Sequence, residues 1–183
     1  YEEAIELWLK LIPLLKSNRN SAAYQELASI AGANPEAEAY MQLSSSYCMA
    51  ERFDEALAAA RSGMEYKMTI KEFMMDYALI EMVAGSPEKA FDVLKHFLIV
   101  ADDYPAVLLL LAALHCIQGQ RGKAEAYLRE LLQKGFNITP GLNRVAKQFY
   151  LVGKEEQARF ILDAMIENKI NDTETMRLID LVG

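Results

Sequence analysis

Phe53-Asp54-Glu55-Ala56-Leu57 decides the fold, because related stretches follow it at a fixed distance along the chain. Its alanine is followed by others in steps of 34 residues, and a small residue lies twelve positions before each of the four. A glycine lies five positions before each of the last three alanines. Three columns in one register over four units indicate an internal repeat. The columns are Ala56, Ala90, Ala124 and Ala158; Ser44, Ala78, Ala112 and Ala146; and Gly85, Gly119 and Gly153.

Between these markers the apolar residues follow the spacing of an amphipathic helix, at i, i+3, i+4 and i+7. Two units show it well, through Tyr40, Leu43, Ser44 and Tyr47 and through Leu142, Val145, Ala146 and Phe149. Glycine permits the positive φ that ends a helix, and small residues let two helices approach closely. Each unit is therefore predicted to be a helix, a turn and a second helix. The turns are expected near Glu51, Gly85, Gly119 and Gly153.

A 34-residue repeat of this kind resembles the tetratricopeptide repeat family. The resemblance is carried by the alanine, glycine and small-residue columns over about residues 36 to 170. It implies an all-α fold of antiparallel helix-turn-helix repeats, stacked into a right-handed superhelical solenoid with a C-terminal capping helix. The expected organisation is one array over 1–183: a degenerate first hairpin at 1–34, repeats at 35–70, 71–104, 105–138 and 139–171, and the capping helix at 172–183.

Both ends of the array depart from the repeat. Pro13 would kink a helix at a cost of ~3 kcal/mol, so Tyr1 to Lys16 is either part of the degenerate hairpin or the remnant of a unit truncated upstream. An opening at Tyr1 rather than Met predicts a segment of a longer protein. At the other end, Asp172 to Val182 begins with capping residues. Its apolar side, Met176, Ile179 and Val182, is expected to cover the last hairpin.

Composition restricts the classes of function. The net charge of −7, the pI near 5.0 and the lack of a Lys and Arg cluster argue against a nucleic-acid partner. The longest apolar stretch, Ala106 to Ile117, is shorter than the ~20 residues needed to span a bilayer. Two cysteines and no signal-peptide pattern predict a reducing, cytoplasmic location.

Residues that could carry chemistry are scattered. His96 and His115 fall in different predicted helices, and only Asp92 lies one turn from His96, which is too few ligands for a metal site. Cys48 and Cys116 occupy equivalent columns two units apart, too distant for a disulfide, and are predicted to be buried free thiols. With no nucleophile elbow or phosphate-binding loop, we expect no catalytic, cofactor-binding or metal-binding residue and no enzyme activity.

The first helices carry a second apolar stripe, offset by one residue from the core stripe. In tetratricopeptide arrays the first helices line the concave surface, so the resemblance implies a partner-binding face there. Two interpretations stay open: the stripe is a groove for an apolar or amphipathic protein segment, or a tightly wound superhelix buries it. The residues are Met41, Ser45, Cys48, Met75, Leu79, Met82, Leu109, Ala113, Cys116, Asn143, Arg144, Lys147 and Tyr150.

Three functions are compatible with these patterns. The first is a protein–protein interaction scaffold whose basic end, from Asn143 to Lys147, fixes the direction of an incoming helix by pairing with its acidic residues. The second is an accessory domain of a larger bacterial enzyme, such as a glycosyltransferase, that docks substrate proteins or mediates dimerisation. The third is a purely structural oligomerisation array.

Overall fold

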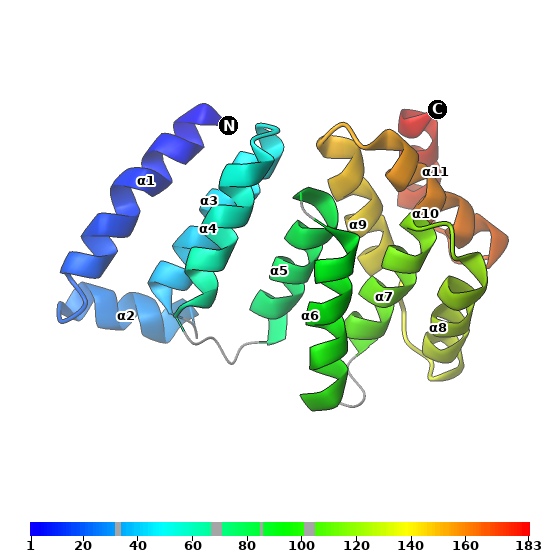
Figure 1. Cartoon of the computed structure of the whole chain (residues 1–183), viewed down its shortest axis with the longest axis horizontal. Helices are drawn as coiled ribbons and strands as arrows, with labels where there is room; N and C mark the ends of the chain where they lie inside the picture. Colours follow the sequence, from blue (N-terminus) through cyan, green and yellow to red (C-terminus); the bar gives the residue numbers. More distant parts are fainter. Residues whose placement is uncertain (32–33, 67–70, 85, 101–104) are drawn as a thin grey trace. The chain divides into compact units, whose positions relative to one another are not determined.

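The computed structural model describes residues 1–31, 34–66, 71–84, 86–100 and 105–183, with side chains from 1–29, 34–66, 75–84, 86–98 and 105–183. These residues form eleven α-helices and no strand, which confirms the expected all-α class (Figure 1). Within them no helix is long and apolar enough to cross a membrane. The helices are α1 Glu2–Ser17, α2 Ala22–Ala31, α3 Pro35–Met49, α4 Phe53–Met64, α5 Lys71–Ala84, α6 Pro87–Val100, α7 Pro105–Ile117, α8 Arg121–Gln133, α9 Thr139–Leu151, α10 Glu155–Glu167 and α11 Thr173–Val182.

The chain divides into two compact units, Tyr1–Gly85 and Ser86–Gly183. In the first unit α3 is the central helix, because α1, α2, α4 and α5 all pack against it. Helix α1 continues through Pro13, whose side chain is exposed. Among the described residues α1 packs along α3 and makes no comparable contact with α2, which lies across the ends of the other helices (Figure 1). These two helices therefore do not form a paired hairpin like that of α3 and α4.

In the second unit α7 is central. It packs against α6, against its hairpin partner α8, and against both helices of the following hairpin, α9 and α10. Helix α11 then packs on α9 and α10. The described hairpins are thus antiparallel helix pairs of the predicted helix-turn-helix kind, while the superhelical path of the whole array stays a prediction.

The turns inside the hairpins share one geometry. Glu51, Gly119 and Gly153 have φ values of 58°, 69° and 73°. In each case the next residue donates its backbone N–H to the carbonyl five positions back, as from Gln120 to His115 at 2.8 Å, which satisfies a carbonyl at the helix end. The predicted turns at these three places are confirmed, and the fourth, at Gly85, lies outside the described residues.

Small residues occupy the helix crossings, as the repeat columns predict. Ala90, Ala124 and Ala158 are all at most 1% exposed, and so are the small residues twelve positions before each alanine. The hydroxyl of Ser44 donates to the carbonyl of Ala56 at 2.6 Å, which satisfies a buried polar group between α3 and α4. The small residues of these two columns therefore allow paired helices to approach closely.

Helix α11 begins with the capping that the sequence indicates. Asp172 accepts from the backbone N–H of Thr175 at 2.9 Å, and the Thr175 hydroxyl accepts from the Asp172 N–H at 3.2 Å. The inward face differs from the expected one, because Thr175 and Leu178 are buried while Met176 is 49% exposed. Met176 therefore covers less of the last hairpin than predicted: it lies beside α10 at the edge of an open hollow, while Thr175 faces α9 and donates its hydroxyl to Asn143.

Candidate functional site

The inner stripe predicted from the sequence is for the most part buried. In the first unit Met41, Cys48, Met75, Leu79 and Met82 are all at most 9% exposed, and only Ser45 faces water. In the second unit the buried members are Ala113, Cys116 and Asn143, the half-buried ones are Leu109 and Tyr150, and the exposed ones are Arg144 and Lys147. This burial favours packing within the fold over an open apolar groove.

Leu109 shows how close this packing is. A methyl group added at Gly141 of α9 would lie 2.5 Å from Leu109 Cδ1 of α7, well inside van der Waals contact. Glycine at position 141 therefore lets the Leu109 side chain pack directly over the α9 backbone. Leu109 packs between the consecutive first helices α7 and α9, so less of its side chain is accessible to a partner.

The exposed face of the first helices lies on neighbouring columns. In α3 the exposed residues are Glu38, Gln42 and Ser45, with Met49 half-buried; in α9 the repeat-equivalent residues Pro140, Arg144, Lys147 and Leu151 are all exposed. These positions follow i, i+4, i+7 and i+11, which is one side of a helix. Among the described residues of α5 and α7, no side chain in the same columns is exposed. Accessible first-helix surface is therefore concentrated on α3 and α9.

The α9 face borders an open hollow of about 360 Å³. Its lining comes from α9 and from the start of α11: Pro140, Asn143, Arg144, Lys147, Asp172 and Glu174. Arg144 and Lys147 are one turn apart and both exposed, so two positive charges stand on one wall. We define these two residues with Pro140 and Leu151 as the α9 basic stripe.

Asn143 has a structural role at the base of this hollow. Its amide donates to Asp172 Oδ1 at 3.0 Å, and its carbonyl oxygen accepts from the Thr175 hydroxyl at 2.9 Å. Hydrogen bonds to Asp172, led by that from the Thr175 backbone, lower the pKa of this carboxyl below 3.8. Asn143 therefore ties the N-terminus of α11 to α9, and Asp172 stays ionised while it caps the helix.

A second hollow, of about 350 Å³, lies beside His115 in the second unit. The imidazole is 5% exposed, stacks on Tyr127 with centroids 5.8 Å apart and meets the Phe91 ring edge to face at 5.9 Å. Its Nδ1 has no hydrogen-bond partner among the described residues. Burial, assisted by the positive charge of Lys123, lowers the pKa of His115 below 6.5. His115 is thus a neutral packing residue at neutral pH.

Neither Cys48 nor Cys116 forms a disulfide, and both are buried. Burial raises the pKa of Cys116 to about 12, so its thiol stays protonated and unreactive at neutral pH. In the part of the chain that the structure describes, no three His, Cys, Asp or Glu side chains gather in a way that could hold a metal ion.

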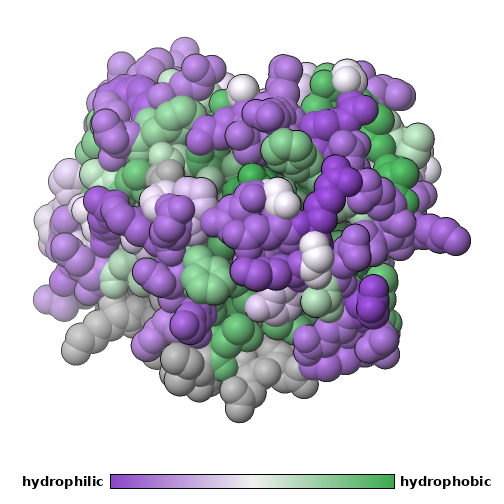
Figure 2. Space-filling model, turned by 45° about the vertical axis from the view of Figure 1, so that its right-hand side comes forward, coloured by the Kyte–Doolittle hydropathy of each residue, from purple (hydrophilic) through white to green (hydrophobic). Residues whose placement is uncertain are grey.

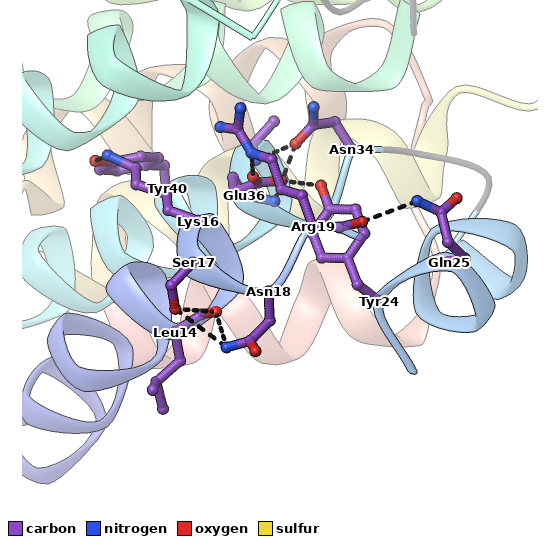
Figure 3. A network of polar contacts seen from close by, with 11 residues as sticks. Leu14, Lys16, Ser17, Asn18, Arg19, Tyr24, Gln25, Asn34, Glu36 and Tyr40 are labelled. Carbon is purple, nitrogen blue, oxygen red and sulfur yellow. Dashed lines mark hydrogen bonds and ion pairs between the residues drawn. The ribbon is translucent and has the colours of Figure 1, made fainter. Parts of the chain in front are cut away.

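Sequence reasoning missed a polar network in the first unit. The carboxylate of Glu36, at 0% exposure, accepts hydrogen bonds from Arg19 Nε and from the Tyr24 hydroxyl (Figure 3). Nearby, Lys16 Nζ donates to the Tyr40 hydroxyl at 2.8 Å. Asn34 at the N-cap and Pro35 at the first helical position mark this helix start in the sequence, but nothing there shows that Glu36 is buried.

The face displayed in Figure 2 is mixed in hydropathy. Among the residues coloured in Figure 2, hydrophobic ones lie in small areas between hydrophilic ones on the face displayed. One apolar hollow of about 400 Å³ lies between α10 and α11, where Ile166, Met176 and Ile179 meet Arg159, Asp163 and Glu167.

Comparisons with known proteins add a single structural likeness. No protein-family model matches the chain, and no curated protein matches it. A solved structure described as a tetratricopeptide repeat protein from Parabacteroides merdae ATCC 43184 is similar over 80% of this chain, with 13% sequence identity and a TM-score of 0.47. The likeness spans 58% of that protein's chain. The helix-turn-helix fold described above rests on the helix order and the 34-residue register.

Proposed function

We propose that this chain is a non-catalytic protein-interaction scaffold whose accessible binding surface is the α9 basic stripe. The observation that carries the proposal is the straight row of Pro140, Arg144, Lys147 and Leu151, all exposed and beside an open hollow. A helical array stacks its repeats through their apolar faces and leaves other faces for partners.

The chemistry of the stripe defines the partner. Two positive charges one turn apart match acidic side chains spaced at i, i+3 or i+4 on a partner helix, while Pro140 and Leu151 supply apolar contacts at either end. The preferred guest is therefore an amphipathic helix with acidic residues at its centre.

The burial of His115 and Cys116, two residue types that often take part in catalysis, supports a non-catalytic role. His115 is buried and neutral, and the Cys116 thiol has a raised pKa. The hypothesis of an accessory domain in a larger bacterial enzyme, such as a glycosyltransferase, is compatible with this scaffold and is tested by the sequence of the full-length gene product.

Selection of helical peptides from a random display library against the folded chain tests the proposal. Enriched peptides are expected to carry acidic residues at i, i+3 or i+4, and the Lys147→Glu variant is expected to lose them. Lys95→Glu is the matched control, since Lys95 is an exposed lysine on α6 outside the stripe. Enriched peptides without acidic residues, or equal capture by wild type and Lys147→Glu, would contradict the proposed surface.

A further inference from the structure

The first helix, α1, has two apolar faces, of which the fold covers one. Ile5, Ile12 and Leu15 are buried, and α1 packs along α3. A second row, which we call the α1 leucine stripe, consists of Ala4, Leu7, Leu11 and Leu14 at i, i+3, i+7 and i+10. Leu7 is 62% and Leu14 is 58% exposed. Figure 1 shows α1 at the edge of its own unit, with α3 and α4 on one side only.

The charges beside this stripe have a definite order. Glu3 and Lys10 follow the same edge of the helix, seven residues and therefore two turns apart. Lys10 lies 3.8 Å from Glu6, but both side chains are more than 70% exposed, and such exposed pairs contribute little to stability. The edge therefore presents a negative charge near the helix start and a positive charge two turns later.

We infer that the α1 leucine stripe is an interface with a second copy of this chain, formed by two α1 helices that run antiparallel. With a two-fold axis at Leu7, each Leu7 meets its counterpart, Leu11 lies within one residue of Ala4 of the second copy, and Leu14 lies beyond the contact. The same register brings Glu3 within one residue of Lys10 twice, once on each side of the axis.

A second copy is the partner that these residues specify, because one patch supplies both the apolar row and the complementary charges that a two-fold interface requires. Antiparallel helices also bring opposite ends of the two helix dipoles together. The surface lies in the first unit on α1, and it goes beyond the function proposed for α9.

The contact involves one helix from each copy, so the association is expected to be weak. Interfaces below ~1,200 Å² belong to transient complexes, so the dissociation constant is expected to be high. Sedimentation equilibrium over a wide concentration range measures it directly. Trp8, the one tryptophan in the sequence, lies half-buried on α1 beside the stripe, so its emission is expected to shift with the same concentration dependence.

Substitution at the axis gives the sharpest test. Leu7→Glu places two carboxylates against each other and is expected to weaken the dimer at least ~10-fold. Leu132→Glu is the matched control, because Leu132 is a 44% exposed leucine on α8, and it is expected to leave the dimer unchanged. Circular dichroism of each variant shows that the helices are intact.

The charge register has an independent test by mixing. Glu3→Lys and Lys10→Glu are each expected to weaken self-association by a few fold at low salt, since exposed pairs contribute under ~1 kcal/mol. An equimolar mixture of the two variants restores opposite charges at both places and is expected to dimerise better than either alone. A wild-type chain that stays monomeric at every concentration overturns the inference, and so does a dimer that survives Leu7→Glu. No gain on mixing overturns the antiparallel register.

Discussion

Replacing Tyr24 with phenylalanine removes one of two hydrogen bonds that the structure directs at the buried carboxylate of Glu36. A hydrogen bond to a charged group contributes about 1.5–3 kcal/mol, and the full amount applies here because Glu36 is 0% exposed. For a chain of 183 residues each kcal/mol corresponds to about 2–4 °C in melting temperature. Tyr24→Phe is therefore expected to lower the melting temperature by about 3–12 °C in a circular dichroism melt.

The contribution of the Glu36 charge to stability can be measured with glutamine at position 36, which keeps nearly the same shape without the charge. Burial alone would raise the pKa of Glu36, but hydrogen bonds from Tyr24 and Arg19 outweigh burial and hold it below 4.5. Because the folded pKa is lowered, this stabilisation is present above pH 4.5 and is lost as the pH falls through the folded value. Glu36→Gln removes this part of the acid sensitivity. In that background Tyr24→Phe should cost only the ~0.5–1.5 kcal/mol of a neutral hydrogen bond.

Tyr127→Phe is the control, since Tyr127 stacks on His115 and no hydrogen bond of its hydroxyl contributes to the Glu36 network. Its melting temperature is expected to stay near that of wild type. If Tyr24→Phe melts like wild type, or if it loses as much stability with Gln at position 36 as with Glu, then the Tyr24 hydroxyl does not stabilise the buried charge of Glu36.

Two further predictions concern the second unit. The new methyl group of Gly141→Ala would require Leu109 Cδ1, the end of a flexible side chain, to move, whereas that of Gly122→Ala has no atom within 4 Å. Gly141→Ala is therefore expected to be less stabilising than Gly122→Ala; denaturant unfolding measures both, and equal effects would contradict the contact. The folded pKa of His115 is below 6.5, so the stability that its neutral form contributes is present above pH 6.5 and is lost as the pH falls. His115→Leu should therefore flatten the decline in melting temperature between neutral pH and pH 5. An unchanged decline would argue against a buried neutral imidazole.

The helix order and the turns could be predicted because they depend on local sequence. Glycine at 119 and 153 permits a positive φ, and the alanine columns mark helix crossings, so spacing alone located these features. The exposed face of each helix could not be read in the same way. Whether Leu79 or Lys147 meets water depends on which helices cover that column, and this is decided by packing between residues far apart in the sequence.

The partner surface shows the same limit at single residues. The resemblance to tetratricopeptide arrays predicts that Asn143 binds a partner, because it lies in a column that lines their concave surface. In the structure Asn143 instead anchors Asp172 and Thr175, which lie 29 and 32 residues later. Glu36 was not singled out, because a glutamate in a first helical turn is ordinarily solvated there. Only the positions of Arg19 and Tyr24 reveal that this carboxylate is buried and paired.

One column of the repeat can decide between an open groove and a buried stripe. Ser45, Leu79, Ala113 and Lys147 are equivalent positions 34 residues apart; the first and last are exposed, while Leu79 and Ala113 are at most 8% exposed. Glutamate at Ser45 or Lys147 meets water and should change stability by under ~0.5 kcal/mol. Glutamate at Leu79 or Ala113 buries a charge with no partner designed for it, so it should lower the melting temperature sharply or unfold the chain. Thermal melts of the four variants measure the contrast under one condition. If Leu79→Glu melts like Ser45→Glu, then Leu79 is exposed to water in solution. The apolar groove would then be the preferred binding surface.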